Sequence, residues 1–484
     1  MPNHIIHKQK VHLHTTLSAE VFTLQNRISN VLKNDLPDKL ELLFDRLSPN
    51  GTILRIDKLE LDLGIINEQT LETEFTEKVL EQLSQCIAGN NTNAVSYYND
   101  SEARVDELKQ SASLIAALIY FLHHGYLPWY EATKKFSEWE AAALQLFSEK
   151  EWQQLAEELR LSVSVNNQPV ARLALQFSES FLEELLFHLH PLLSKNWNRL
   201  YADILAIIKK YVKEVSNADE QKIFLWKQVI AAALTAGNEV DFAIELLRNI
   251  YPGAENLFQN LAQNKGEIEG IIQDENDPVF KFLKSLNAIE PDIDDAQIPP
   301  KIENKPDPRK KTDPGEKEFF TGNCGMVILH PFLLMYFTEL GIVQDNQFKD
   351  KELQQRAVLL LHYLATGETE VAEFNLLMAK LLCGLDFGEP VPKSIELTEQ
   401  EKEESASLLK AITQHWKPLN NTSAEGLRTS FFQRDGTLRQ TEAGWTLHVE
   451  QKAFDILMNQ LPWGIGTIKL PWMKNILNVE WNYN

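Results

Sequence analysis

The chain is divided into many short apolar segments, and most of them end at a glycine or just before a proline. SASLIAALIYFLHHG stops at Gly125, with Pro128 close behind, and later segments stop at Gly341, Gly367 and Gly384. Within each segment the apolar residues recur at helical spacing, and a terminal glycine favours the left-handed end of a helix. No heptad pattern lasts for three or four repeats, which argues against a long coiled coil. The sequence therefore predicts a mainly α protein made of short helices.

The composition narrows the class of partner. The 484 residues carry a formal net charge of -22, and the only dense basic run, residues 309–311, lies among acids and prolines. A surface that binds a nucleic-acid duplex needs clustered Lys and Arg, so we expect no nucleic-acid partner. No stretch approaches about 18 uninterrupted apolar residues, so we expect no membrane-spanning helix.

The cysteines and the opening residues bear on the compartment. Cys86, Cys324 and Cys383 lie far apart, which argues against a disulfide framework and against a Cys-x-x-Cys metal or redox motif. The first residues lack the apolar core of a signal peptide. We therefore expect synthesis and assembly in the reducing cytoplasm.

The first part of the chain, residues 1–90, is predicted to be a small α/β layer. Residues 4–14 and 52–64 alternate between apolar and polar side chains, as strands do. Residues 17–33 and 71–87 have helical spacing instead. Whether the two strands pair in parallel or antiparallel fashion is left open.

Three further parts follow. Residues 106–288 contain short amphipathic helices that resemble stacked helical hairpins, although no fixed-period repeat is present. Residues 289–318 are rich in proline and charge, and we expect a disordered or extended linker there. Residues 319–484 are predicted to be a second helical domain, with a capping box at Thr398 and Glu401 and a short β element at 437–451.

A tripeptide, Leu-Pro-Trp, occurs three times. The copies are Leu127-Pro128-Trp129, Leu461-Pro462-Trp463 and Leu470-Pro471-Trp472. Proline forces the preceding leucine into extended geometry, so each copy projects a Leu and a Trp from a stiff, non-helical segment. The five C-terminal tryptophans fit either a ligand platform or a core in which each indole N–H meets a carbonyl, and we favour the core. Each copy is then a clamp laid on helices.

Catalytic and metal-binding patterns are weak. His4, His7, His12 and His14 lack the spacing and the companion ligands of a zinc site. Cys324 has no local signature of a nucleophile, and no phosphate loop, nucleophile elbow, kinase motif or dinucleotide fingerprint is present. We expect no enzyme, no metal and no cofactor.

An ordered set of C-terminal segments resembles one known family. GMVILHPFLLMYFTELGI, RAVLLLHYLATG, LLMAKLLCGL, HWKPLNNTSAEGLRTSFFQRDGTL, WTLHVE and FDILMNQLPWGIGTIKLPWM occur in this order, and HIIHKQKV and LRIDKLELDLG stand near the start. Together they resemble the tape measure proteins of extracellular contractile injection systems, which are phage-tail-like particles. The resemblance covers about residues 4–85 and 321–481. The middle region is similar only in its general character, and FLHHGYLPW is its most similar local segment.

The resemblance implies a non-enzymatic assembly protein that helps set the length of the inner tube. Its partners would be the tube, baseplate and cap or terminator proteins, and self-association is left open. It would reside in the cytoplasm during assembly, and a place inside the tube of the mature particle is left open. The Leu-Pro-Trp copies and a turn of RxGxL type, containing Arg434 and Gly436, would form a structural signature and not a catalytic site.

The ruler role conflicts with the short helices. A fully helical chain of this length would span about 730 Å, and a fully extended one about 1,600 Å. Compact helical domains would be far shorter than either. Three explanations stay open: a partly unfolded middle and linker, stacked copies, or indirect control of length. A helical-repeat scaffold or adaptor that binds other proteins, unrelated to injection, is the alternative function.

Overall fold

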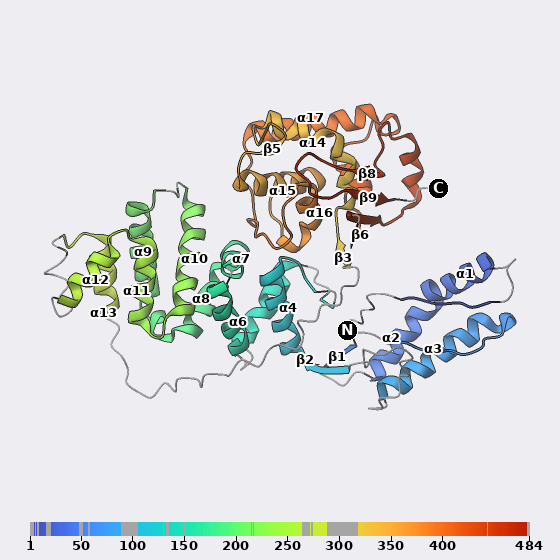
Figure 1. Cartoon of the computed structure of the whole chain (residues 1–484), viewed down its shortest axis with the longest axis horizontal. Helices are drawn as coiled ribbons and strands as arrows, with labels where there is room; N and C mark the ends of the chain where they lie inside the picture. Colours follow the sequence, from blue (N-terminus) through green and yellow to red (C-terminus); the bar gives the residue numbers. More distant parts are fainter. Residues whose placement is uncertain are drawn as a thin grey trace. The chain divides into compact units, whose positions relative to one another are not determined.

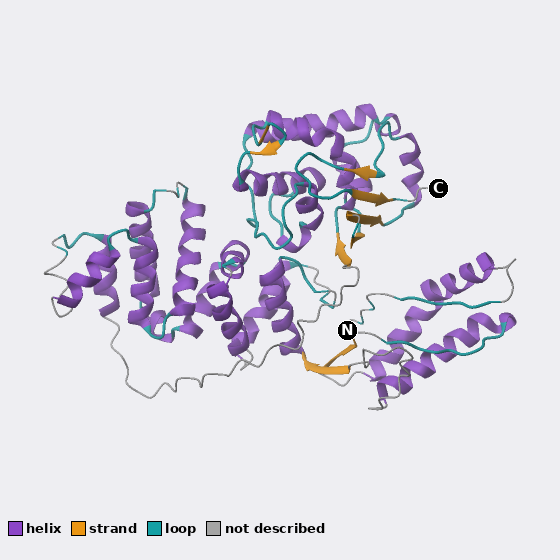
Figure 2. Ribbon diagram, in the orientation of Figure 1, coloured by secondary structure: helices purple, strands orange, loops and turns teal. Residues whose placement is uncertain are grey.

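A computed structural model describes most of the chain (Figure 1). The described residues are 4, 6, 9–15, 21–47, 52–56, 59–88, 105–128, 130–131, 135–148, 152–165, 167–213, 215, 217–263, 272, 274–287, 318–442 and 444–481. The chain forms two compact units: residues 1–117 with 130–132, and residues 118–129 with 133–484. Helices dominate, as Figure 2 shows, and the prediction of a mainly α protein is confirmed.

The first unit consists of helices and one short antiparallel strand pair. Its elements are α1 (Val21–Asn30), the π-helical η1 (Val31–Asp35), α2 (Leu36–Leu47), β1 (Thr52–Ile56), the 3-10 turn η2 (Glu68–Thr70), α3 (Leu71–Ala88) and β2 (Val105–Lys109). The core lies between the helices and includes Ile28, Leu40 and Phe75. Arg27 of α1 makes two bonds to the Glu72 carboxylate of α3, at 2.6 and 2.8 Å.

The strand predictions for this unit are partly wrong. Residues 9–14 are not a strand, and among the described residues of 52–64 only those of β1 are in one. The partner of β1 is β2, which pairs antiparallel from Thr52 opposite Lys109 to Ile56 opposite Val105. Residues 61–63 alternate because Leu61 and Leu63 pack on the helical core while Asp62 accepts a bond from the Gly64 amide. Alternation therefore marks a half-buried extended segment as well as a strand.

The helical part of the second unit is built around one buried helix. Its helices are α4 (Gln110–His124, whose first half belongs to the first unit), α5 (Phe136–Gln145), η3 (Leu146–Ser148), α6 (Trp152–Val165), α7 (Gln168–Gln176), α8 (Glu179–Leu189), η4 (Pro191–Lys195), α9 (Trp197–Tyr211), α10 (Ala218–Thr235), α11 (Glu239–Ile250), α12 (Ala254–Gln263) and α13 (Pro278–Asn287). Helix α10 contacts α6, α7, α8, α9 and α11. Its sequence explains this position, because Trp226, Ala232 and Leu234 point in different directions around the helix and all are buried.

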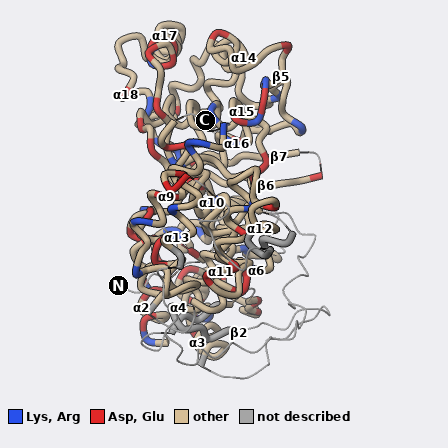
Figure 3. The backbone as a smooth tube through the Cα atoms, turned by 90° about the vertical axis from the view of Figure 1, so that its left-hand side faces the viewer, with Lys and Arg blue, Asp and Glu red and all other residues tan. Residues whose placement is uncertain are grey.

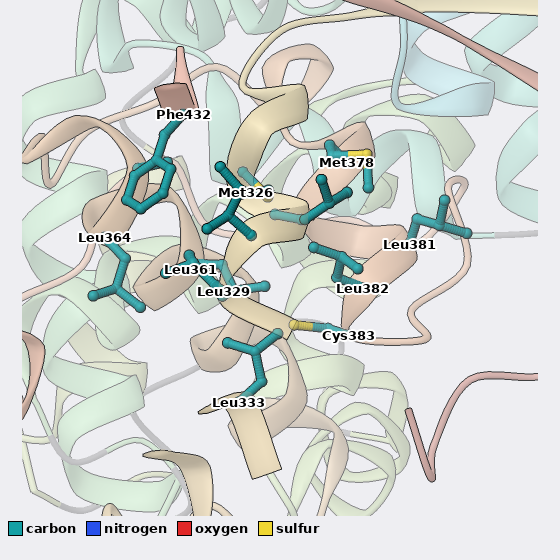
Figure 4. Close-up of a cluster of buried hydrophobic side chains, with 14 of the residues drawn as sticks. Met326, Leu329, Leu333, Leu361, Leu364, Met378, Leu381, Leu382, Cys383 and Phe432 are labelled. Carbon is teal, nitrogen blue, oxygen red and sulfur yellow. The ribbon is translucent and has the colours of Figure 1, made fainter. Parts of the chain in front are cut away.

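The remainder of the second unit packs short helices around a dense apolar core. The helices are η6 (Cys324–Leu329), α14 (His330–Glu339), α15 (Lys351–Thr366), η7 (Glu373–Asn375), α16 (Leu377–Leu382), α17 (Glu399–His415), η8 (Lys417–Leu419), α18 (Ala424–Leu427), the π-helical η9 (Arg428–Phe432) and η10 (Ala453–Gln460). Figure 4 shows Met326 and Leu329 of η6 among Leu361, Met378 and Leu382. The predicted capping box is confirmed: Thr398 and Glu401 bond each other's backbone amides.

A five-stranded sheet closes this part of the unit, in the order β3-β6-β7-β9-β8. The strands are β3 (Glu318–Thr321), β6 (Gly436–Thr441), β7 (Gly444–Val449), β8 (Thr467–Ile468) and β9 (Leu477–Glu480); a separate pair joins β4 (Val343–Gln344) to β5 (Gln347–Phe348). Among the described strands, β7 and β9 are the pair that runs parallel. One row across the sheet, Phe319-Leu438-Leu447, is buried, whereas Arg439 of the next row bonds Glu318 and is partly exposed. The β element predicted at 437–451 is the β6–β7 hairpin.

The predicted division into four parts stays a prediction. Of the predicted linker, residues 289–318, only Glu318 is among the described residues, and it begins β3. The second unit contains residues from both predicted helical domains.

Gly325 tests the packing of the C-terminal core. A Cβ added there would lie 1.6 Å from the Phe431 carbonyl oxygen, so we expect Gly325→Ala to lower the free energy of unfolding by about 3 kcal/mol or more. Gly464→Ala is the matched control, because nothing lies within 4 Å of its added Cβ. Urea unfolding followed by circular dichroism measures both. Equal stability of the two variants would contradict the packing described here.

Candidate functional site

The second Leu-Pro-Trp copy lies against the start of the C-terminal core. Trp463 donates its indole N–H to the Ile328 carbonyl at 3.1 Å, and its ring meets Phe332 edge-on at 5.0 Å. Leu461 is half-buried and Pro462 is exposed. The segment is irregular; the indole bond fixes it to η6, and the ring contact fixes it to α14.

The third copy is more deeply buried. Leu470 and Trp472 are buried and Pro471 is exposed. Trp472 donates its indole N–H to the Leu382 carbonyl at 2.8 Å, and its ring packs on Phe348 at 4.9 Å. A Cβ at Gly384 would lie 2.6 Å from the Trp472 carbonyl oxygen, so this helix end must be a glycine. Strand β8 stands between the two copies.

The first copy is described only in part. Leu127 is half-buried and Pro128 is buried, while Trp129 lies outside the described residues. Its role as a clamp therefore stays a prediction.

The five C-terminal tryptophans lie in the C-terminal core or pack against it. Trp416 donates to the Leu457 carbonyl at 3.1 Å, and Trp481 donates to the Asp455 carboxylate at 3.0 Å. Trp445 is half-buried and packs against Phe319 and Phe387. Each indole that reaches a carbonyl or carboxylate holds an irregular segment in place.

Arg434 anchors the end of the chain. Its guanidinium is fully buried and bonds the Asp455 carboxylate at 2.6 Å, and the same carboxylate accepts the Trp481 indole. The arginine also lies 4.7 Å from the centre of the Phe454 ring. Gly436 does not sit in a turn as predicted: it opens β6, where a Cβ would lie 2.7 Å from the Cys324 sulfur. The glycine is required by close packing.

A second buried ion cluster was not predicted. Arg172 of α7 makes two bonds to the Glu373 carboxylate of η7, at 2.8 and 3.1 Å. Lys380 of α16 bonds the same carboxylate at 2.6 Å. All three side chains are fully buried, and Arg172 and Glu373 are 201 residues apart in sequence. The cluster therefore ties the helices around α10 to the C-terminal core.

Backbone carbonyls complete this cluster. Arg172 also donates to the Leu122 and Gly388 carbonyls, and Lys380 donates to those of Phe387 and Glu389. The cations outnumber the carboxylate in the cluster, and burial lowers the pKa of Lys380. Protein oxygens accept four hydrogen bonds from Arg172 and three from Lys380, so the cluster is built to hold these segments together.

The neighbourhood of the cluster contains the loop after α4. Gly125 has a φ of 78°, and a Cβ there would lie 2.5 Å from a Glu373 carboxylate oxygen and 2.7 Å from the Phe387 carbonyl. Tyr126 packs edge-on against Phe319 at 5.1 Å. Gln176 of α7 bonds the Val391 carbonyl and accepts from the Glu373 amide. The signal that sequence reasoning missed is a lone Lys and a lone Arg in apolar helices.

Comparison with known proteins gives the family. A family model described as "Contractile injection system tape measure protein" matches residues 3–481. The chain belongs to that family. No curated protein and no solved structure matches the chain. The resemblance predicted from the ordered C-terminal segments is thus confirmed, and it extends through the middle region.

Membership in the tape measure family is consistent with a structural rather than a chemical role for both clusters. Among the described residues, no helix is long and apolar enough to cross a membrane. Within the same residues, no group of three or more His, Cys, Asp or Glu is placed to hold a metal ion.

Outside the ion clusters, burial favours the neutral forms of Cys324, Cys383 and His362. Burial raises the pKa of the Cys324 thiol, and it raises that of Cys383 as well. Burial lowers the pKa of His362 to about 4. The Nδ1 atom of His362 has no hydrogen-bond partner, whereas Nε2 lies 3.2 Å from the Thr366 hydroxyl. A neutral thiol is a poor nucleophile, so Cys324 is a packing residue.

Glu373→Gln tests the cluster. The substitution leaves two buried cations without their carboxylate, so we expect it to lower the free energy of unfolding by about 3–5 kcal/mol. Glu245→Gln is the control, because its pair with Arg248 is exposed and should contribute at most about 1 kcal/mol. Urea unfolding at neutral pH measures both. A loss at Glu373→Gln no larger than that of the control would show that the cluster does not hold the unit together.

His362 predicts a pH dependence of stability. Its pKa is about 4 in the folded chain, so the unfolded chain takes up a proton first as the pH falls. The contribution of neutral His362 to the free energy of unfolding is fully present above about pH 6.5 and is lost as the pH falls toward the folded pKa. The expected loss is about 2 kcal/mol between about pH 7 and about pH 5. Urea unfolding of the wild type and of His362→Gln at both pH values isolates the contribution of His362. Identical pH slopes in the two proteins would be the contrary result.

Proposed function

We propose that this chain helps to set the inner-tube length of a contractile injection particle, and that its second unit does so while folded. The family match supports a place in tube assembly. The observation that supports a folded unit is the buried bonding of Arg172 and Lys380 to Glu373. A helical adaptor unrelated to injection is the weaker alternative, because the family model spans residues 3–481.

The helices are too short to act as a helical rod. Among the described elements, α3 and α10 are the longest helices, with 18 residues each. Each such helix spans about 27 Å. A ruler made by stretching the second unit would have to unfold it first.

Stretching would be expensive in free energy. It would separate Glu373 from both cations, which leaves buried charge unpaired until water reaches it. It would also expose the wholly buried residues of α10, among them Leu225, Val229 and Ile230, at about 25 cal/mol for each Å² of apolar surface. A folded unit that contacts the growing tube, directly or through other subunits, requires neither step.

The proposal includes partners and location. The tube, baseplate and cap or terminator proteins are the expected partners, and self-association is compatible with the same role. The chain is expected in the cytoplasm during assembly and inside the tube afterwards. The Leu-Pro-Trp segments and Arg434 serve this role by fixing the C-terminal core, and they take no part in catalysis.

A loop insertion distinguishes a second unit that stays folded from one that is stretched along the tube. About 20 Gly and Ser residues are inserted after Gly237, in the short loop that joins α10 to α11, where the fold tolerates extra length at a small entropic cost. If the unit stays folded, tube length measured by electron microscopy is unchanged. If the unit is stretched, tubes grow by about 66 Å, at about 3.3 Å per residue.

The matched control places the same insertion between α13 and β3. Growth with this insertion alone would assign the ruler to the connecting segment and leave the folded unit in place. Growth with the α10–α11 insertion would contradict the proposal.

A further inference from the structure

A groove lies beside α8, away from the ion clusters. It has a volume of about 540 Å³ and is lined by residues of α5, η3 and α8. This volume falls in the range of about 300–1,000 Å³ that binding sites occupy. Its lining residues all belong to the second unit.

The floor of the groove is apolar and aromatic. Phe147 packs against Phe181 at 5.4 Å and against the His188 ring at 4.9 Å. Leu144 and Phe187 are half-buried and border the same space. Apolar side chains that stay half-exposed around a hollow provide area that a partner can bury.

The rim is acidic. Two of the glutamates in α8 line the groove, and neither α5 nor α8 contains a Lys or Arg. Of the two that line the groove, Glu183 accepts the Trp197 indole N–H at 3.0 Å. The other, Glu184, has a side chain that is 53% exposed, and among the described residues the His188 ring lies 3.7 Å from its carboxylate. Its carboxylate is available to a cation from outside.

We propose that this groove binds a basic amphipathic helix of a partner protein. An apolar side chain would fill the space over Phe147 and Phe187, and a Lys or Arg on the next turn would meet Glu184. The charge of the rim favours this occupant, because an acidic peptide would be repelled by the Glu184 carboxylate and an uncharged one would leave it uncompensated. Docking of an apolar helix face in a groove is a recurrent mode of peptide recognition. The inference is independent of the tube-length role.

Fluorescence anisotropy with the full chain tests this site. The probe is a fluorescein-labelled model helix of about 18 residues, with Leu on one face and Lys on the other, and a second probe carries Glu in place of Lys. We expect the Leu/Lys probe to bind and the Leu/Glu probe to fail. Ser180→Trp, a change at an exposed position on the rim, should block the groove and abolish binding.

A charge-matched pair of variants distinguishes binding in the groove from nonspecific attraction to the acidic chain. Glu184→Lys and Glu368→Lys change the net charge equally, and Glu368 is exposed far along the sequence, just after α15. We expect Glu184→Lys to weaken binding by about tenfold or more, and Glu368→Lys by less than about twofold. Equal weakening by the two variants, binding of the Leu/Glu probe, or an unchanged affinity in Ser180→Trp would each overturn the proposal.

Discussion

The bonding of Glu373 to Arg172 and Lys380 is the interaction on which the second unit depends. A carboxylate removed from water is stable only beside compensating cations, and here two of them reach it with good geometry. Both cations also donate to backbone carbonyls. These bonds are specific in direction, so they fix how α7 lies on the C-terminal core in a way that apolar packing alone does not.

A second network fixes the C-terminal end. Arg434 and Trp481 share the Asp455 carboxylate, and the indoles of Trp463 and Trp472 bond carbonyls of η6 and α16. Residues 461–481 contain no helix, so side-chain hydrogen bonds hold this segment where a regular element would be held by backbone hydrogen bonds. The charged residues outside these networks are spread along the described trace, with acidic and basic positions interspersed (Figure 3).

The helices were predictable because local rules and the fold agree. Gly367 and Gly384 end helices with positive φ, as their positions after apolar runs indicated, and the Thr398 capping box formed as expected. The strands were harder. Strand β2 lies in DELK-type sequence that has no apolar alternation, and it forms because β1 supplies its partner. The lone Arg172 and Lys380 in apolar helices indicate buried cations, but their partner could not be predicted, because only tertiary packing brings Glu373 to Arg172 across 201 residues.

The central claim is that the helices around α10 stay folded on the C-terminal core while tube length is set. Hydrogen exchange with mass spectrometry, carried out on purified particles and on the free chain, tests it most directly. The amides of α7 and α10 are the sensors, because both helices have buried faces and both disappear in a stretched chain. The account predicts equal protection of these amides in the particle and in the free chain. Loss of protection in the particle, with the free chain still protected, would contradict it.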